Sequence, residues 1–183
     1  MLLTTPRLVL RELELDDAPF MLGLLTDPDW LRFIGDRGVR DVAGARAYLA
    51  AGPIAMALRE GFGMLRVTLA SSGEAIGVCG LVKREGLDDV DLGFAFLPAF
   101  RGQGYGLEAA SAVLAHARSA LGLRRIVAIT SPENRDSIAL LERIGFGFER
   151  STVLAEGKPA VNLSASVAAW PADGAKPPPH EPI

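Results

Sequence analysis

Short stretches in which apolar and polar residues alternate run along the chain and predict β-strands. Residues 7–13, RLVLREL, alternate in the way that a strand with one buried face does. The expected strands cover residues 7–13, 64–69, 75–82, 90–97, 125–130, 148–154 and 160–167. The turn sequence Ser71-Ser72-Gly73-Glu74 separates the second strand from the third, so these two should form a hairpin.

Apolar residues that recur at spacings of three and four predict helices between these strands. The expected helices cover residues 16–26, 41–61, 104–121 and 134–143. Asp16 and Asp41 are the N-cap candidates of the first two, because a short acidic side chain can accept the free amides of a first turn. Gly52-Pro53 should interrupt the second helix, and Gly145 should end the last one.

The order of these elements predicts an α/β chain of the α+β kind. Strands and helices alternate at both ends around a run of strands, which is typical of a mixed sheet with helices on both faces. The length of 183 residues fits a single domain over residues 1–170. Residues 171–183, PADGAKPPPHEPI, are rich in proline and are expected to form a disordered tail.

Composition narrows the classes of protein that the chain can belong to. The 19 Lys and Arg against 22 Asp and Glu give a net charge of −3, which argues against a generalist nucleic-acid binder. No apolar run approaches the roughly 18 to 20 residues of a spanning helix, and we expect neither a membrane nor a secretory signal. Cys79 is the only cysteine, so an internal disulfide and a cysteine-based zinc site are excluded. The expected location is the cytoplasm.

The segment after the strand over residues 90–97 carries the clearest chemical signal. Pro98-Ala99-Phe100 is followed by a glycine-rich loop, Arg101 to Gly106, and then by a helix. Closely spaced glycines let the backbone approach a ligand, and the free amides at a helix N-terminus favour a phosphate. The loop lacks the Lys-Ser/Thr of a Walker motif, and Leu107 stands where a dinucleotide-binding fingerprint needs its third glycine. A tight turn without a ligand is the alternative.

Arg101-x-x-Gly104-x-Gly106 resembles the Q/R-x-x-G-x-G/A signature of the GNAT superfamily of N-acetyltransferases. The likeness covers residues 4–167 and is closest to the RimJ/RimL-like branch of that superfamily. Three segments carry it in the right order: TPRLVLRELELDDAPFMLGLL, DLGFAFLPAFRGQGYGLEA and PENRDSIALLERIGFGFE.

The resemblance implies a mostly antiparallel mixed sheet in which the strand before the loop splays from its neighbour to form a groove for acetyl-CoA. The pantetheine arm would lie along that strand near Phe96 and Leu97. The pyrophosphate would be held by the loop, which consists of Arg101, Gly102, Gln103, Gly104, Tyr105 and Gly106. A primary amine would then attack the thioester directly, without a covalent enzyme intermediate.

The resemblance also suggests which residues handle protons. Leu141 stands where many members have a tyrosine that protonates the leaving thiolate, so Ser137 of the Asn134-x-x-Ser137 motif becomes the candidate donor or sulfur-positioning group. A serine that caps the helix is the alternative for Ser137. Asp91 matches the position of an acidic general base, with a solvated strand-end aspartate as the alternative.

Other residues are given lesser roles. Glu85, Asp88 and Asp89 could form an acidic rim that attracts a cationic amine, while Cys79 is read as a small buried hydrophobe and His116 as structural. Trp30 and Phe33 could line an acceptor pocket, although a core position is the alternative.

The sequence therefore predicts an acetyl-CoA-dependent N-acetyltransferase that acts on a protein N-terminal amine or a small amine. A non-catalytic acyl-CoA-binding or regulatory domain is the alternative from another class, and acetylation of aminoacyl-tRNA is a second enzymatic one. The expected partners are acetyl-CoA and the amine acceptor, with no metal, membrane or nucleic acid. A homodimer is left open.

Overall fold

The computed structural model describes residues 1–154 and 159–167, so the predicted tail over residues 171–183 lies outside the described residues. The described strands are β1 Leu2–Thr4, β2 Leu8–Glu12, β3 Met64–Leu69, β4 Ala75–Val82, β5 Val90–Phe96, β6 Arg125–Thr130, β7 Gly147–Thr152 and β8 Val161–Val167. The α-helices are α1 Ala18–Leu25, α2 Pro28–Phe33, α3 Val42–Leu49, α4 Ala55–Glu60, α5 Tyr105–Ser119 and α6 Arg135–Arg143. Short 3₁₀ turns η1 Leu15–Asp17 and η3 Pro98–Phe100 and a π-helical segment η2 Ala50–Ile54 complete the described elements.

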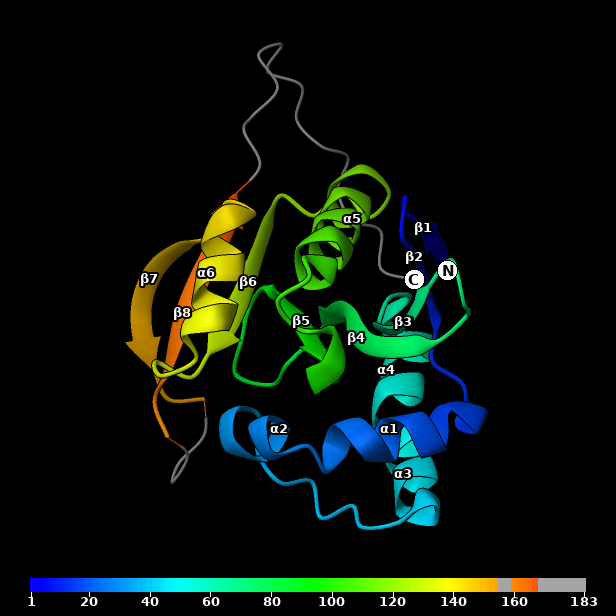
Figure 1. The fold of residues 1–183 in the computed structure, drawn as a ribbon. Helices are drawn as coiled ribbons and strands as arrows, with labels where there is room; N and C mark the ends of the chain where they lie inside the picture. The colour runs from blue at the N-terminus through cyan, green and yellow to red at the C-terminus, as the bar shows by residue number, and fades with distance from the viewer. Residues whose placement is uncertain (155–158, 168–183) are drawn as a thin grey trace.

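The strands form one eight-stranded sheet in the order β1-β2-β3-β4-β5-β6-β8-β7 (Figure 1). Every neighbouring pair is antiparallel except β5 and β6, which are parallel. The predicted mixed, mostly antiparallel sheet is confirmed, and the sheet is open. β1 was not predicted, because three residues are too few to show an alternating pattern.

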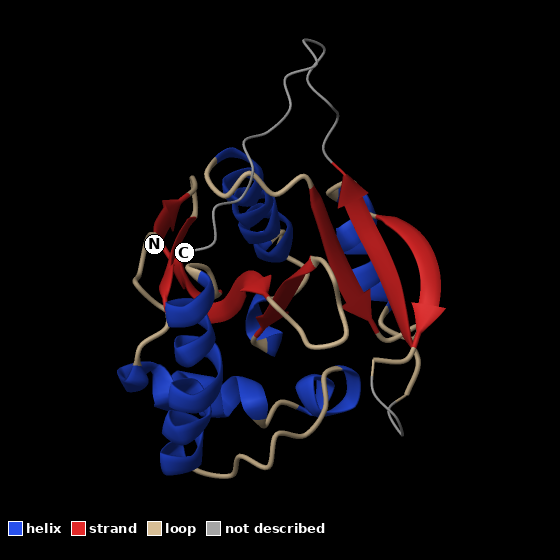
Figure 2. Ribbon diagram, turned by 180° about the vertical axis from the view of Figure 1, so that it is seen from behind, coloured by secondary structure: helices blue, strands red, loops and turns tan. Residues whose placement is uncertain are grey.

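Helices cover both faces of this sheet, as predicted. α5 and α6 lie in front of the sheet in Figure 1, and α3 and α4 lie in front of it in the reverse view of Figure 2. The larger core packs apolar residues of β2 to β6 against the buried side of α5 and α6. A second core packs α1, α2 and α3 against the other face, where Val78 of β4 is buried. None of the helices in the described ranges is long and apolar enough to cross a membrane.

The helical region before β3 follows the sequence closely. Asp41 caps α3, accepting the Gly44 amide at 2.7 Å, and Gly61 ends α4 in the left-handed conformation with φ 74°. At Gly52-Pro53, where an interruption was expected, the helix continues as the π-helical segment η2. Its wider turn accommodates a proline, which has no amide to donate. α1 ends at Leu25, close to the expected end at residue 26, and a short helix that was not predicted follows, because Asp27 accepts the amides of Asp29 and Trp30.

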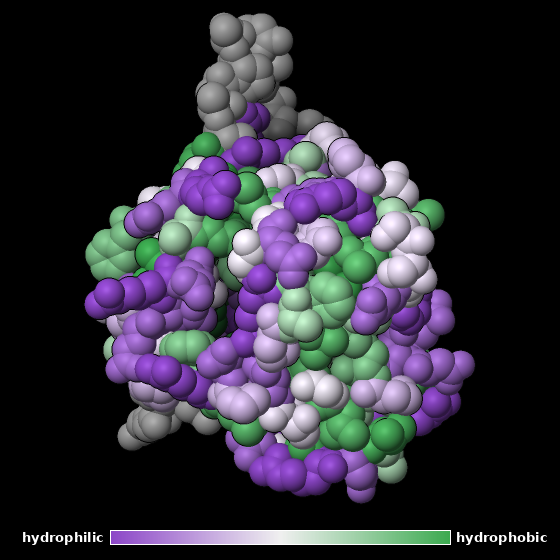
Figure 3. Space-filling model, in the orientation of Figure 1, coloured by the Kyte–Doolittle hydropathy of each residue, from purple (hydrophilic) through white to green (hydrophobic). Residues whose placement is uncertain are grey.

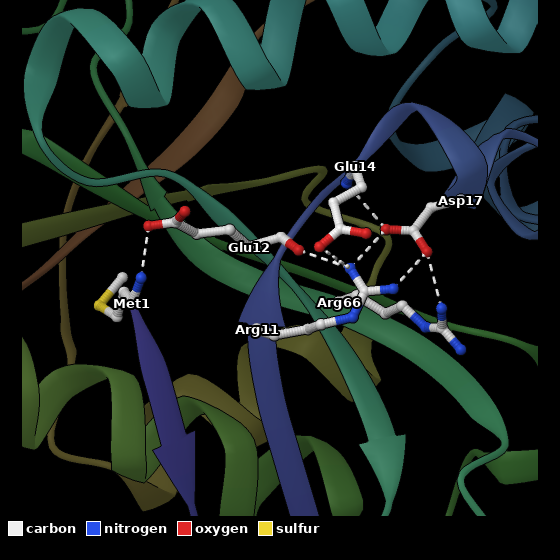
Figure 4. A network of polar contacts seen from close by, with 6 residues as sticks. All are labelled: Met1, Arg11, Glu12, Glu14, Asp17 and Arg66. Atoms are coloured by element: carbon white, nitrogen blue, oxygen red, sulfur yellow. Dashed lines mark hydrogen bonds and ion pairs between the residues drawn. The ribbon is translucent and has the colours of Figure 1, made fainter.

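A buried carboxylate joins the first turn of the helical region to the sheet (Figure 4). Asp17 is 2% exposed and accepts two hydrogen bonds from Arg11 of β2, at 2.7 and 2.8 Å. Arg66 of β3 and the Glu14 amide donate to the same carboxylate at 2.7 and 2.9 Å. Burial on its own would raise the pKa of Asp17, but the bonds from Arg11, Glu14 and Arg66 outweigh it and lower the pKa below its ordinary value.

Replacing this carboxylate should destabilise the fold at neutral pH. Asp17→Asn leaves two arginines without a buried counter-charge, at a cost of about 3 kcal/mol. For a chain of this size that is a fall in Tm of roughly 10 °C, measurable by calorimetry. Asp16→Asn is the control, because the Asp16 side chain is 91% exposed and pairs only with Arg46.

The same carboxylate should make stability depend on pH in a defined direction. Since the folded-state pKa of Asp17 lies below the ordinary aspartate value of 3.8, its contribution to stability is fully present above that value and is lost as the pH falls through the folded-state pKa. The Tm difference between wild type and Asp17→Asn should therefore shrink in acid. A difference that stays constant from neutral pH into acid would contradict the assignment.

Candidate active site

The sheet divides at a fork between β5 and β6. β5 is paired with β4 over its whole length, from Asp91 opposite Val82 to Phe96 opposite Gly77. It is paired with β6 only at Val90 and Asp91. In the described residues, the other edge of β5 therefore runs unpaired from residue 92 to residue 96. An unpaired strand edge can hydrogen-bond an extended ligand as an added strand does.

Asp91 occupies the corner of this fork. It is 1% exposed, and its carboxylate accepts the Ile129 amide of β6 at 3.2 Å and pairs with Arg84. Burial raises the pKa of Asp91 to about 6, against the opposing effect of Arg84 and of the Ile129 amide. The alternative of a solvated strand-end aspartate is wrong, because this carboxylate is buried between two strands.

The glycine loop follows the free end of β5. Gly102 and Gly104 have φ values of 72° and 81°, a left-handed conformation that side chains rarely adopt. The Arg101 amide donates to Pro98 within η3, whereas no acceptor is recorded in the described part of the chain for the amides from Gly102 to Gly104. The first turn of α5, which starts at Tyr105, adds further free amides. The loop thus presents a row of donors suited to an anion.

Arg7 holds this loop from a distant part of the chain, which the sequence did not predict. Its guanidinium pairs with Glu108 at 2.6 Å, donates to the Gln103 carbonyl at 3.0 Å and lies 4.5 Å from the centre of the Tyr105 ring. Glu108 also accepts the Thr5 hydroxyl and the Arg7 amide. A separation of 96 to 101 residues leaves no local pattern that could have revealed these contacts.

The Arg101 side chain points away from the loop amides and joins three elements. Its guanidinium donates to the Phe96 carbonyl at 2.8 Å, to Asp27 at 2.6 Å and to Asp29. Asp27 is also the cap of α2, so Arg101 fixes the N-terminus of α2 against the end of β5. The predicted cofactor role of Arg101 is thereby joined by a structural one.

A groove of about 430 Å³ lies along the free edge of β5, and Figure 3 shows the surface hollowed beside α6. Among the predicted residues, those that line the groove are Phe96, Arg101, Gly102, Gly104, Gly106, Asn134 and Ser137. Three others do not line it. Leu97 packs into the second core, the Gln103 amide side chain bonds Ala99, and the Tyr105 ring lies against Arg7, so only their backbone can serve the groove.

The start of α6 places Ser137 beside the groove. Asn134 caps the helix by accepting the Ser137 amide at 3.1 Å. The alternative in which Ser137 is the capping residue is therefore wrong. In the described residues, no partner is recorded for the Ser137 hydroxyl, and Ser137 lines both the groove and a second cavity.

The second cavity, of about 450 Å³, opens on the other side of β5. It meets the groove at shared residues from three elements, which are Trp30, Phe33, Ile34, Phe94, Ala95, Asn134 and Ser137. Trp30 and Phe33 line both cavities, and Trp30 is also a buried residue of the second core, so the core alternative holds for it as well. Asp91 and Leu141 line the second cavity but not the groove.

The predicted acidic rim is absent from this cavity. Glu85, Asp88 and Asp89 do not line it, and Asp89 pairs with Arg125 at 2.8 Å. The charged residues of its described lining are instead Arg37, Arg59, Lys83, Arg84 and Asp91.

Cys79 and His116 lie outside both cavities. Cys79 is fully buried in the main core, and burial raises the pKa of its thiol. Within the described residues, no group of three or more His, Cys, Asp and Glu residues could hold a metal ion.

Solved structures that share this fold are acetyltransferases. The acetyltransferase from Agrobacterium tumefaciens superposes with a TM-score of 0.77 at 28% identity, over 90% of this chain and 93% of that one. RimL, a ribosomal L7/L12 alpha-N-protein acetyltransferase solved in complex with coenzyme A, superposes with a TM-score of 0.75 over 92% of this chain and 98% of its own. At 21% sequence identity, the likeness to RimL is evidence for a shared fold only.

Sequence comparison identifies the family. The uncharacterized N-acetyltransferase p20 of Bacillus licheniformis is 28% identical over 146 residues, which are 79% of this chain and 81% of the relative. The family model described as "Acetyltransferase (GNAT) domain" matches residues 7–147. The chain belongs to the GNAT acetyltransferase family, and its class of enzyme is N-acetyltransferase.

Proposed function

We propose that this enzyme transfers the acetyl group of acetyl-CoA directly to a primary amine. The observation that carries the proposal is the fork, whose free β5 edge leads at one end to the loop amides and opens halfway along into the second cavity. One cavity would hold the cofactor and the other the amine. The cavities meet at Phe94, Ala95 and Ser137, where the two reacting groups would come together.

The residues of the groove fit acetyl-CoA. The unpaired edge of β5 can hydrogen-bond the amides of the pantetheine arm, and the free amides at Gly102 to Gly104 can bind the pyrophosphate together with the N-terminus of α5. The contacts of Arg7 with Glu108 and Gln103 hold these amides in place before the cofactor arrives. RimL, which has the same fold, was solved with coenzyme A.

Acetyl-CoA would supply an activated thioester, so the protein needs to orient it, polarise its carbonyl and protonate the sulfur. A backbone N–H on the free edge of β5 would polarise the carbonyl. Ser137 would donate to the sulfur, since its hydroxyl has no recorded partner in the described chain and lies where the cavities meet. The buried Leu141 has no proton to donate.

Asp91 would act from the acceptor side. It lines the second cavity, and its raised pKa of about 6 makes it a stronger base than an ordinary aspartate while leaving it ionised at neutral pH. Its bonds to Ile129 and Arg84 give it a second role, which is to hold the strands at the fork. The general-base role stays a prediction.

A non-catalytic acyl-CoA-binding domain is the second candidate, and the leucine at position 141 favours it. Steady-state release of free thiol in the presence of acetyl-CoA and a panel of N-terminal peptides, amino acids, aminoglycosides and polyamines separates the two. Turnover with any member supports the enzyme, whereas tight acetyl-CoA binding without turnover supports the binding domain. A cytoplasmic location and a homodimer stay predictions of the sequence.

The loop assignment can be tested by adding a side chain at Gly104. Gly104→Val forces a β-branched side chain into a left-handed position, with its Cβ 3.4 Å from the Arg7 guanidinium that holds the loop. The disturbed row of loop amides should bind coenzyme A more than tenfold more weakly, about 1.4 kcal/mol or more. Calorimetry measures the affinity. The control is Gly73→Val, which carries a similar backbone strain, with φ 75°, in the turn between β3 and β4. Unchanged affinity in a folded Gly104→Val protein would remove the assignment.

The role of Ser137 can be tested through its hydroxyl. Ser137→Ala should lower kcat on the order of tenfold to a hundredfold with little change in acetyl-CoA affinity, which is the low end for general-acid help because a thiolate with a pKa of roughly 8.5 already leaves readily. The loss should shrink as the pH rises. Ser111→Ala, on the exposed side of α5, is the control. Weaker cofactor binding at full kcat would mean that Ser137 only positions the pantetheine.

The base role of Asp91 predicts an acid limb in the rate profile. In the wild type, kcat/KM should fall as the pH drops below about 6, because protonation removes the base. Asp91→Asn should lower kcat about a hundredfold and abolish that limb. If the limb persists in the variant while coenzyme A binding is lost, Asp91 serves the fork and not proton transfer.

A further inference from the structure

The second cavity has an excess of positive charge. Its described lining carries four cationic side chains, Arg37, Arg59, Lys83 and Arg84, and one carboxylate, that of Asp91. Asp91 is already paired with Arg84. The other three cations come from the segments before α3, at the end of α4 and after β4, so three separate parts of the chain bring positive charge to one cavity.

These three cations have few counter-charges. In the described ranges of the chain, no hydrogen bond or ion pair is recorded for the guanidinium of Arg37, and Lys83 donates only to the carbonyls of Leu87 and Asp88. Arg59 pairs with Glu60, which does not line the cavity. Arg37 and Arg84 also act on the same phenol, since their charges oppose the rise in the pKa of Tyr48 that burial causes.

Two buried polar groups in the same wall also lack a partner. The Trp30 indole nitrogen and the Thr130 hydroxyl are buried without a hydrogen-bond partner in the described structure, and both residues line the cavity. Trp30 is only 8% exposed. A buried N–H or O–H without a partner costs about 1 to 3 kcal/mol, so two residues of this lining hold polar groups whose hydrogen-bonding capacity is unused.

The rest of the lining is apolar and aromatic, with Tyr48, Met56, Met64 and Phe94 among its residues. A volume of about 450 Å³ suits a small molecule, and the cavity shares residues with the groove at the junction where the amine would be acetylated. Its lining therefore combines apolar side chains, three cations that we call the cationic rim (Arg37, Arg59 and Lys83), and a junction with the groove.

We infer that the acceptor is a small primary amine that also carries an anionic group, a carboxylate or a phosphate, bound by the cationic rim of Arg37, Arg59 and Lys83. The inference rests on the proposed function and names its substrate class. The anionic group fixes the orientation of the acceptor, so that its amine points to the junction at Phe94 and Ser137. The same rim repels polyamines, because several like charges would meet in one cavity.

The positive rim also favours the reactive form of the amine. An ammonium group is disfavoured near other cations, and its pKa falls, so that more of the bound acceptor is the neutral nucleophile. Arg84 takes no part in this effect beyond its pair with Asp91.

The test compares matched amines for binding to the full chain in the presence of coenzyme A. The pairs are phenylalanine with phenethylamine, leucine with isoamylamine, phosphoethanolamine with ethanolamine, and glucosamine 6-phosphate with glucosamine; spermidine and an N-terminal peptide complete the panel. In at least one pair, the member with the anionic group should bind about tenfold or more tightly than its partner without it. The first two pairs report a carboxylate and the last two a phosphate.

The variant Arg37→Gln/Lys83→Gln should remove that preference by weakening the member with the anionic group, and should not weaken binding of the partner that lacks it. Arg46→Gln, which removes a charge outside both cavities, should keep the preference. Binding that is tightest for spermidine, for the peptide or for a member without an anionic group would overturn the inference, and so would a preference that survives in the double variant or the absence of any binding.

Turnover separates this inference from the proposed function. An anionic amine that binds through the rim but releases no thiol from acetyl-CoA would keep the inference about the ligand and contradict the enzyme. Thiol release only with amines that lack an anionic group would support the enzyme and contradict the inference about the ligand.

Discussion

The pairing of β5 with β6 stops after Asp91, and the candidate site depends on this fork, where a buried carboxylate lies between the two strands. The Ile129 amide, which would otherwise serve the strand ladder, donates to Asp91, while Arg84 supplies the counter-charge. A side chain thus takes the place of the next backbone contact. Beyond this point one strand edge is free, with a cavity on each side of it, and the rest of the structure keeps that edge exposed.

The chain stabilises the open edge from outside the fork. Arg7 fixes the glycine loop from the N-terminal strand region, and Arg101 fixes α2 against the end of β5. Asp17 joins β2 and β3 to the start of the helical region. All three use charge-assisted bonds that bridge separate elements, and such bonds hold loops and helix ends in positions that apolar packing alone leaves adjustable.

Most of the elements and the glycine loop could be predicted from the sequence, because their signals are local. Alternation marked β3, a turn followed by an apolar run marked β4, Asp41 marked the start of α3, and the glycine spacing marked the loop. β1 was missed because it has only three residues. Two features could not be predicted, because each brings together residues that are far apart in the sequence. They are the contacts of Arg7 with the glycine loop, and the cationic rim of the second cavity. Glu85 and Asp88 were misjudged for the same reason: nearness in the chain to β5 does not place a side chain in the cavity.

The position of α2 limits how this enzyme can change its acceptor in evolution. Trp30 and Phe33 line both cavities, and Arg101 binds the cap of the helix that carries them. A mutation in α2 that reshapes the second cavity, where we propose that the acceptor binds, also reshapes the groove proposed for the cofactor. Tyr48, Met56 and Arg59, on α3 and α4, line the second cavity but not the groove. New specificities are therefore expected to arise from mutations in α3 and α4, because these helices can change the second cavity while the groove keeps its lining.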